Sequence, residues 1–334
     1  FITGGTGFIG THLTNLLHEV HPEAKIYNLD IIEPGTPLPT VKNYKPALRK
    51  GEEHAATFIY CDVRQTIELE KVNITPEDVI FNFAAVHRTP GHPDPAYFET
   101  NIRGAENVCA FAERHGIRKI VFTSSIAPYG AAEELKEETT LPMPNTPYGI
   151  SKLVAEKIHQ TWQAGGEGRQ LTIVRPGVVF GRGENGNFTR LYWGIRGHKF
   201  MYPGRKDTIK ACIYVKELVR FMLYRLEHHD SGVELYNCCY EPAYTIEHIV
   251  ESMKRVTNMK VKVPFMPGWL IMTAAGIAGA LGSPMGICPA RVRKLQISTN
   301  ICGKKLSASG YRFHYTFEEA LADWYKDNGN LYLQ

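Results

Sequence analysis

The chain opens with Phe1-Ile-Thr-Gly-Gly-Thr-Gly-Phe-Ile-Gly10, a pattern typical of a β-strand that turns through glycines into a helix. Gly4 permits the tight turn, Gly7 lets a pyrophosphate approach the backbone, and Gly10 lets the helix pack close to its strand. The N–H groups at the helix N-terminus carry a partial positive charge and would face the phosphates. The spacing therefore predicts a dinucleotide-binding turn, with an ordinary glycine turn as the alternative.

An acidic residue follows at the distance expected for a ribose contact. A second apolar run ends on Asp30, about twenty residues past the glycines, where a carboxylate holds the adenosine ribose hydroxyls. No Arg or Lys stands beside Asp30, which favours NAD over NADP. Because residue 1 lies inside the first strand, we expect the natural N-terminus to precede it, and a removed leader stays open.

The composition is that of a globular protein, and the length suits one large domain and a smaller lobe. The chain has 334 residues and a formal net charge of +4, without a long run of like charge. This balance does not indicate a nucleic acid partner, although a polyanionic small substrate is compatible with it. The seven cysteines are scattered and lack metal-site spacing. They predict a cytoplasmic protein without a metal site or a disulfide framework.

One uncharged segment, residues 264–282, complicates this interpretation. Its apolar core is about fifteen residues long, whereas a membrane-spanning helix needs roughly twenty. One interpretation is a helix packed in the substrate lobe. The other is an apolar patch that contacts a membrane face or a lipid-linked substrate.

Strands and helices alternate along the first half of the chain, which predicts an α/β fold with a Rossmann-type, doubly wound parallel sheet. We expect residues 1–180 to form the NAD-binding domain and residues 181–334 to form mainly a smaller, interleaved substrate-binding lobe. Residues 211–240 are expected to return to the first domain. After the first two strands, the expected elements are strands at 57–62, 79–85, 119–125 and 171–176, and helices at 97–116 and 148–163.

The sequence Tyr148-Gly-Ile-Ser-Lys152 carries the most informative chemistry. Positions four apart lie on one face of a helix, so the phenol and the ammonium would project into the same cleft. A nearby ammonium and the positive nicotinamide of NAD both favour the phenolate, which would lower the tyrosine pKa toward the range of a general base. A tyrosine four residues before a lysine is also common by chance. It favours a catalytic pair here because it follows the glycine turn.

With these motifs in this order, the chain resembles the extended short-chain dehydrogenase/reductase superfamily, in particular its NAD-dependent nucleotide-sugar epimerase/dehydratase branch. The resemblance covers nearly the whole chain. The motifs that carry it are Thr3–Gly10, Asp62-Val63, Asn82–Ala85, Asn101–Asn107, Thr123–Gly130, Tyr148–Lys152 and Arg175–Gly181.

The resemblance implies catalytic roles for Ser125, Tyr148 and Lys152. Tyr148 would be the base, Lys152 would bind the nicotinamide ribose and tune the tyrosine, and Ser125 would bind the substrate oxygen. The neighbouring Ser124 could be confused with Ser125, and its alternative role is to tie down the strand end. The implied cofactor-binding residues are Gly4, Gly7, Phe8, Ile9, Gly10, Asp30, Asp62, Val63, Ala84, Ala85, Asn101, Tyr148, Lys152 and Pro176.

One departure from the family pattern, which covers two adjacent positions, narrows the reaction. Dehydratases of the branch carry an Asp-Glu pair straight after the catalytic Ser or Thr position, and here those positions are Ile126 and Ala127. Neither side chain can move a proton, so elimination of water is disfavoured. Reversible hydride transfer at one carbon remains.

Substrate contacts are also implied by the resemblance. Asn187 and Lys210 align with groups that relatives place near the nucleotide diphosphate, although lysine lacks the bidentate fork of arginine. Arg291 is the expected second cation, with Arg293 or a solvated surface charge as alternatives. Ser298 aligns with the residue that gates the second sugar carbon, and its small side chain would admit an N-acetyl group. The implied set is His87, Ser125, Asn187, Lys210 and Arg291.

These expectations predict an NAD-dependent nucleotide-sugar 4-epimerase acting on a UDP-hexose or UDP-N-acetylhexosamine. The alternative is an alcohol oxidoreductase resembling the 3β-hydroxysteroid dehydrogenases, which the uncharged segment would suit. A scaffold that binds NAD without turnover is disfavoured by the intact catalytic trio. Relatives commonly dimerise through the helices at 97–116 and 148–163, so the resemblance implies a homodimer.

Overall fold

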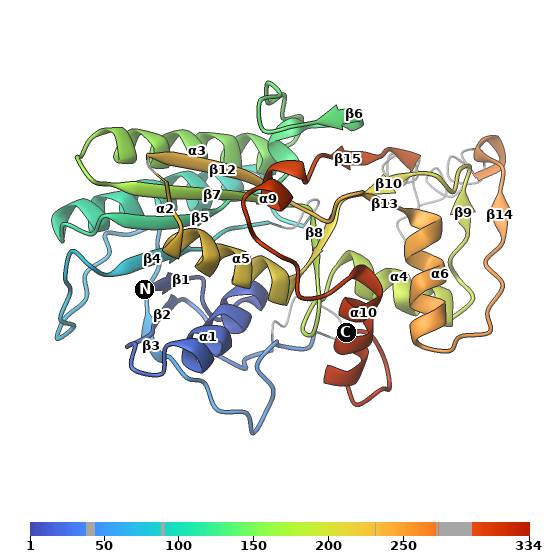
Figure 1. Ribbon diagram of the computed structural model, residues 1–334, viewed down its shortest axis with the longest axis horizontal. Helices are drawn as coiled ribbons and strands as arrows, with labels where there is room; N and C mark the ends of the chain where they lie inside the picture. The colour runs from blue at the N-terminus through green and yellow to red at the C-terminus, as the bar shows by residue number, and fades with distance from the viewer. Residues whose placement is uncertain (38–43, 88–90, 231, 272, 274–295) are drawn as a thin grey trace.

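The computed structural model describes residues 1–37, 44–87, 91–230, 232–271, 273 and 296–334. Its centre is a seven-stranded sheet, entirely parallel, in the order β12-β7-β5-β4-β1-β2-β3 (Figure 1). This arrangement confirms the predicted doubly wound sheet. The strands are β1 (Ile2–Thr3), β2 (Tyr27–Asp30), β3 (Thr57–Tyr60), β4 (Val79–Asn82), β5 (Lys119–Thr123), β7 (Gln170–Pro176) and β12 (Val233–Cys238).

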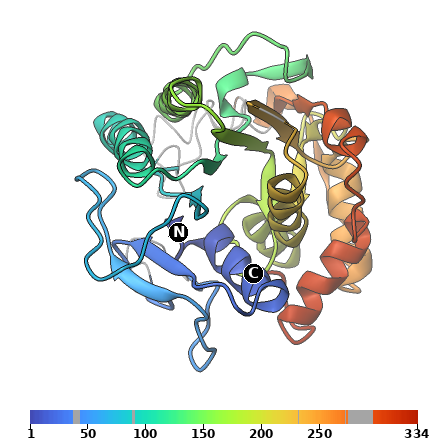
Figure 2. The same ribbon diagram turned by 60° about the vertical axis from the view of Figure 1, so that its left-hand side comes forward.

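Helices cover both faces of this sheet, with α1 and α5 on one side and α2 and α3 on the other (Figure 2). Alternate residues of a strand point to opposite faces, and β5 shows the consequence. Val121 packs in the core beneath α1 and α5, whereas Ile120 and Phe122 pack beneath α2 and α3. The helices are α1 (Phe8–Val20), α2 (Asp94–Arg114), α3 (Pro147–Ala164) and α5 (Val215–Glu227).

A smaller lobe follows, built on a four-stranded sheet in the order β13-β10-β15-β6 (Figure 1). Two further strand pairs, β11 with β8 and β14 with β9, extend the structure. Aromatic residues dominate the core, including Phe180, Phe317 and Trp324. The strands are β6 (Ala132–Lys136), β8 (Val178–Phe180), β9 (Tyr202–Pro203), β10 (Ile209–Lys210), β11 (Cys212–Tyr214), β13 (Tyr244–Thr245), β14 (Phe265–Met266) and β15 (Thr299–Ile301).

The remaining helices belong mostly to this lobe, where α6 packs against both α4 and α10. They are η1 (Ala127–Tyr129, a 3₁₀ turn), α4 (Asn187–Arg196), α6 (Ile246–Val256), α9 (Lys304–Ala308) and α10 (Phe317–Asp327). Within residues 211–240, β12 joins the edge of the main sheet beside β7, whereas β11 pairs with β8 in a separate sheet. The exact domain boundary stays a prediction.

About half of the uncharged segment falls outside the described residues. Of residues 264–282, the structure describes 264–271 and 273, where β14 lies. Trp269 is 73% exposed and Phe265 is 51% exposed. No helix in the described part of the chain is long and apolar enough to cross a membrane.

Candidate active site

The glycine turn and the loop after β4 meet at the point where the strand order reverses. β1 lies between β2 and β4, and such a position forms the crevice in which doubly wound sheets bind nucleotides. Gly4 follows β1 with a φ of +71°, and a Cβ built on it would lie 2.7 Å from the backbone nitrogen of Ala84. A Cβ built on Gly10 would lie 2.5 Å from the Cα of Gly5. The close approach that the sequence predicts is therefore present.

The N-terminus of α1 has the geometry of an anion site. The N-cap is Gly7, and no side chain caps the first turn. Phe8 and Ile9 are partly buried and pack their side chains against the core. A helix start that offers backbone N–H groups, next to glycines that let another group come close, fits the pyrophosphate of NAD.

Two carboxylates stand at the ends of neighbouring strands. Asp30 ends β2 and accepts hydrogen bonds from the backbone nitrogens of Thr6 (3.1 Å) and Ile31 (2.7 Å). Burial raises the pKa of Asp30, against the effect of these hydrogen bonds. Asp62 forms an ion pair of 2.6 Å with Arg64, which holds its pKa below the usual range. Asp30 therefore borders the glycine turn, where a ribose contact is expected.

Other predicted cofactor residues also hold the crevice together. Asn101 accepts a hydrogen bond from the nitrogen of Val86 (2.8 Å) and donates one to the hydroxyl of Ser151 (2.8 Å). It thereby fastens the loop after β4 to α3. Val63 is buried in the core, and Pro176 ends β7.

The start of α3 brings Tyr148 to Ser125. The hydroxyl of Thr146 caps the helix and accepts a hydrogen bond from the nitrogen of Gly149 (3.1 Å). A Cβ on Gly149 would lie 2.6 Å from the carbonyl oxygen of Ala127, so the helix packs directly on the turn after β5. The hydroxyl of Tyr148 lies close to Ser125, which acts on the pKa of the phenol.

Lys152 lies one helical turn further along α3, as the spacing predicts. Its Nζ donates a hydrogen bond of 2.8 Å to the carbonyl oxygen of Thr123, the last residue of β5. The same nitrogen lies 4.7 Å from the ring centroid of Phe122. The three predicted catalytic residues therefore gather at the carboxyl edge of the sheet, close to where β5 ends.

The pKa values differ from the expectation drawn from the spacing. Burial raises the pKa of Tyr148 to about 12, and the nearby Ser125 side chain opposes this effect only in part. Burial lowers the pKa of Lys152 to about 7. The ammonium is directed to a backbone carbonyl of β5, and desolvation outweighs any stabilisation of the phenolate by the protein's own groups. The predicted lowering of the tyrosine pKa therefore depends on a bound positive nicotinamide.

A buried carboxylate that the sequence argument missed lies beside this trio. Glu156 follows Lys152 by one more turn of α3 and forms a bidentate ion pair with Arg175 of β7. It also accepts a hydrogen bond of 2.5 Å from Ser124. The continued spacing of four residues along the helix, Tyr148-Lys152-Glu156, was the signal that could have revealed it.

His159, next on the same helix face, is buried and uncharged. Its Nδ1 lies 2.7 Å from the carbonyl oxygen of Ala155, and its Nε2 lies 3.1 Å from Asn82. Burial lowers the pKa of His159 to about 4. The unfolded chain therefore binds a proton at this side chain between pH 6.5 and about 4, whereas the folded chain does not.

We expect this histidine to make the protein acid-labile. Its contribution to the free energy of unfolding is fully present above pH 6.5. As the pH falls toward 4, the free energy of unfolding drops by about 3 kcal/mol because the unfolded chain binds the proton. Urea unfolding from pH 7 to 4.5 measures the slope, which should be shallower in His159→Gln. His18 is exposed near the end of α1, and His18→Gln serves as the control substitution. Equal slopes in all three proteins would contradict this assignment.

The predicted substrate residues lie on several elements. His87 is exposed in the loop after β4, and Asn187 begins α4 and accepts a hydrogen bond of 2.8 Å from Arg190. Lys210 lies in β10 and donates a hydrogen bond of 2.7 Å to the carbonyl of Ile297. Arg291 and Arg293 lie outside the described residues.

Ser298 lies beside β10, which carries Lys210. The Ser298 side chain is buried, and its hydroxyl accepts a hydrogen bond of 3.2 Å from the nitrogen of Ile209. Its nitrogen donates to Glu133 (2.6 Å). These contacts hold Ser298 between β10 and β6, so its proposed role at the second sugar carbon stays a prediction.

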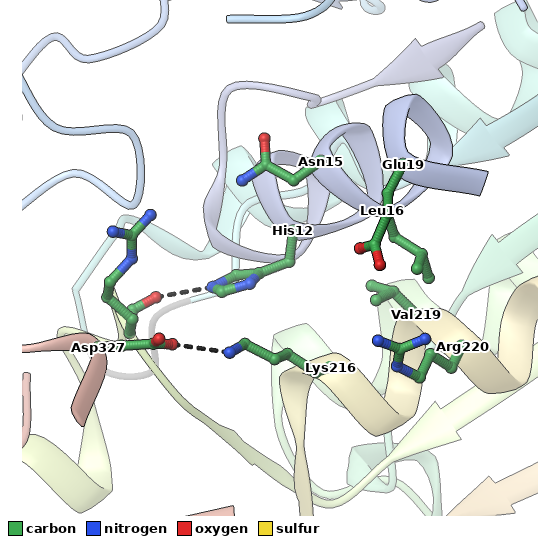
Figure 3. A pocket seen from close by; sticks show the side chains of 9 residues that line it. His12, Asn15, Leu16, Glu19, Lys216, Val219, Arg220 and Asp327 are labelled. Atoms are coloured by element: carbon green, nitrogen blue, oxygen red, sulfur yellow. Dashed lines mark hydrogen bonds and ion pairs between the residues drawn. The ribbon is translucent and has the colours of Figure 1, made fainter. Parts of the chain in front are cut away.

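A cavity of about 230 Å³ between α1 and α5 is separate from this trio (Figure 3). Its charged groups are largely satisfied within the protein. Lys216 pairs with Asp327 (2.9 Å), and His12 contacts the carbonyl oxygen of Arg182 (2.8 Å). The lining residues are His12, Asn15, Leu16, Glu19, Arg182, Lys216, Val219, Arg220 and Asp327. None of them belongs to the predicted site. Among the described residues, no group of His, Cys, Asp and Glu could hold a metal ion.

Two curated proteins are similar to this chain in sequence over most of its length. N-acetyl-alpha-D-glucosaminyl-diphospho-ditrans,octacis-undecaprenol 4-epimerase of Escherichia coli O157:H7 is 30% identical over 96% of this chain and 92% of its own length. The 3-beta-hydroxysteroid dehydrogenase of Mycolicibacterium neoaurum is 24% identical over 96% of this chain and 89% of its own.

A solved structure has the same fold. It is the UDP-N-acetylglucosamine 4-epimerase of Methanobrevibacter ruminantium M1 in complex with UDP-N-acetylmuramic acid, with a TM-score of 0.74 and 21% identity. The match covers 98% of this chain and 97% of that chain. The family model described as NAD dependent epimerase/dehydratase family matches residues 1–239, and the chain therefore belongs to this NAD-dependent family.

Proposed function

We propose that the chain is an NAD-dependent 4-epimerase that acts on a UDP-hexose or a UDP-N-acetylhexosamine. The observation that carries this proposal is that Tyr148 and Ser125 lie close together at the carboxyl edge of the parallel sheet, with Lys152 one helical turn away. A phenol and a serine hydroxyl side by side can bind one substrate oxygen, which is the arrangement needed to oxidise an alcohol and reduce the ketone. The 4-epimerase names of similar proteins support the choice of C4.

Tyr148, Ser125 and Lys152 have different roles in the proposed proton transfer. The crevice beside Gly4, Gly7 and Asp30 would hold NAD, which would supply reversible hydride transfer at C4 of the sugar. Tyr148 removes the proton of the C4 hydroxyl and gives it back, while Ser125 donates a hydrogen bond to the same oxygen. Lys152 lies on the same helix face, where it would hold the nicotinamide ribose, and the positive nicotinamide would favour the phenolate. The residues after Ser125 are Ile126 and Ala127, which supply neither an acid nor a base for water loss.

A lipid-linked form of the substrate is part of the proposal. The Escherichia coli relative is named for a sugar attached through diphosphate to undecaprenol. In this chain, Phe265 and Trp269 are exposed at β14 and just after it, at the start of the uncharged segment. Aromatic side chains of this kind favour the membrane interface, so we propose a peripheral membrane contact there.

We also propose a cytoplasmic homodimer. The outer face of α3 exposes two apolar side chains one turn apart, Ile150 (39%) and Val154 (37%). A second copy that packs α2 and α3 against this face would bury them. The six described cysteines are free thiols, which suits a reducing compartment.

The test is a substrate panel without added cofactor. Purified protein is mixed with UDP-Glc, UDP-GlcNAc and polyprenyl-diphospho-GlcNAc, and the sugars are separated by chromatography while NADH absorbance is followed. Conversion to the C4 epimer without net NADH supports the proposal. Comparison of the UDP-sugars with polyprenyl-diphospho-GlcNAc shows whether the substrate must carry the lipid. If no sugar changes, and NADH forms only with NAD and a sterol or another apolar alcohol, the steroid dehydrogenase alternative takes its place.

A further inference from the structure

Glu156 joins three elements beneath the proposed catalytic residues. Its side chain is 1% exposed and that of its partner Arg175 is 3% exposed. Arg175 donates through Nε (2.8 Å) and Nη2 (2.6 Å), so both carboxylate oxygens are bound. The hydroxyl of Ser124 donates to one of the same oxygens at 2.5 Å. One carboxylate therefore connects α3 with β5 and β7.

The contact with Ser124 reaches the proposed catalytic serine through the backbone. Ser124 immediately precedes Ser125, and its nitrogen donates a hydrogen bond of 2.8 Å to the carbonyl oxygen of Val174. Its backbone and its side chain are thus both held. A shift of Ser124 would move the Ser125 hydroxyl away from the phenol.

Charge connects Glu156 to Lys152 as well. Glu156 follows Lys152 by one turn of α3, and its negative charge opposes the effect of burial on the lysine pKa. The Lys152 ammonium donates a hydrogen bond to the carbonyl oxygen of Thr123 in β5. His159 lies further along α3. Across the helix Arg175 of β7 is itself paired with Glu156. Removing the carboxylate would leave two buried cations without their anion.

We propose that Glu156 is a positioning residue of this site, which holds Ser125 in place through Ser124 and keeps a negative charge beside Lys152. This inference rests on the proposed function, because Ser125 and Lys152 take their roles from it. Glu156 itself does not touch the substrate. Its expected effects are therefore on the turnover rate and its pH profile rather than on substrate binding.

The chain provides a matched control in a second buried ion pair. Arg225 donates to Glu234 of β12 through Nε (2.9 Å) and Nη2 (2.5 Å), and the two side chains are 4% and 8% exposed. This pair has the same bidentate geometry and joins α5 to β12, away from the catalytic trio. Glu234→Gln should therefore destabilise the protein in the same way as Glu156→Gln without changing catalysis.

The experiment compares holoenzymes of the wild type, Glu156→Gln, Glu156→Asp, Ser124→Ala and Glu234→Gln. Stability is measured by urea unfolding, and C4 epimerisation is measured across pH. We expect Glu156→Gln to lower kcat about 10- to 100-fold, with KM changed by less than about threefold. The alkaline limb of its pH–rate profile should move down by about one pH unit. The reason is that the Lys152 ammonium loses a neighbouring negative charge and therefore gives up its proton at a lower pH.

The other variants separate the two roles. Glu156→Asp keeps the charge but shortens the reach, so it should lower kcat while leaving the alkaline limb near its wild-type position. Ser124→Ala removes only the serine contact and should lower kcat about 3- to 10-fold without moving the limb. If Glu156→Gln does not fold, these two variants carry the test.

Two outcomes would overturn the proposal. One is that Glu156→Gln keeps the wild-type kcat and both limbs while losing as much stability as Glu234→Gln. The other is an unchanged pH dependence of NAD retention, measured as the NAD that dialysed holoenzymes keep at each pH. The NAD readout needs no sugar substrate, so it tests Glu156 even if the wild type shows no C4 epimerisation and the proposed function fails.

Discussion

Replacing Tyr148 with phenylalanine is expected to lower kcat by about 100- to 10,000-fold, the range of a lost general base. The ring fills the same space beside the ring of Tyr97, 6.3 Å between centroids, so packing changes little. Only the hydroxyl that lies close to Ser125 disappears. The measurement is steady-state epimerisation, together with the amount of NAD released on denaturation, which should equal that of the wild type.

The matched control is Tyr60→Phe. Tyr60 ends β3 and is 70% exposed, so loss of its hydroxyl should change neither kcat nor stability. A Tyr148→Phe enzyme that keeps more than about a tenth of the wild-type kcat would show that another group removes the proton. Loss of bound NAD in Tyr148→Phe would instead point to a binding role for the phenol.

Replacing Gly10 with alanine is expected to remove bound NAD and to destabilise the protein by about 1–3 kcal/mol, the usual cost of overpacking. The new Cβ would lie 2.5 Å from the Cα and 2.6 Å from the carbonyl oxygen of Gly5. Both contacts are with backbone, which cannot yield as a flexible side chain would. The helix must therefore move away from the turn whose backbone is expected to hold the pyrophosphate. Urea unfolding and the NAD content of the purified protein measure the two effects.

Two other glycines separate the causes. Gly194 lies within α4, and its new Cβ would first meet the Cβ of Phe200 at 3.4 Å, so Gly194→Ala should keep both stability and NAD. In Gly7→Ala the nearest protein atom is the carbonyl oxygen of Gly4 at 3.2 Å. This variant should keep most of its stability but bind NAD less tightly. Normal NAD content in Gly10→Ala would contradict the assignment of the turn.

Local patterns in the sequence predicted much of the fold. The glycines at 4 and 10 are constrained by backbone atoms in the way that their spacing indicates. The apolar runs became strands of one parallel sheet, because strands buried on both faces are apolar along their whole length. The four-residue spacing of Tyr148 and Lys152 placed both on one helix face close to Ser125.

Features that depend on distant segments could not be predicted in this way. Glu156 continues the four-residue spacing of α3, but its pairing with Arg175 arises only because α3 crosses β7, which no local pattern contains. The high pKa of Tyr148 arises from burial by several elements, which a motif does not contain. Lys210 donates to the carbonyl of Ile297 far along the chain, and no spacing rule predicts that contact.

The most direct test of the proposed epimerisation follows the hydrogen at C4. UDP-GlcNAc that carries deuterium at C4 is incubated with the protein without added NAD, and the product is analysed by NMR and mass spectrometry. If hydride is returned to the carbon that it left, the C4 epimer retains the deuterium and no NADH absorbance accumulates. A C4 epimer in which hydrogen from water replaces the deuterium, or label that collects in NADH beside an oxidised sugar, would contradict the account.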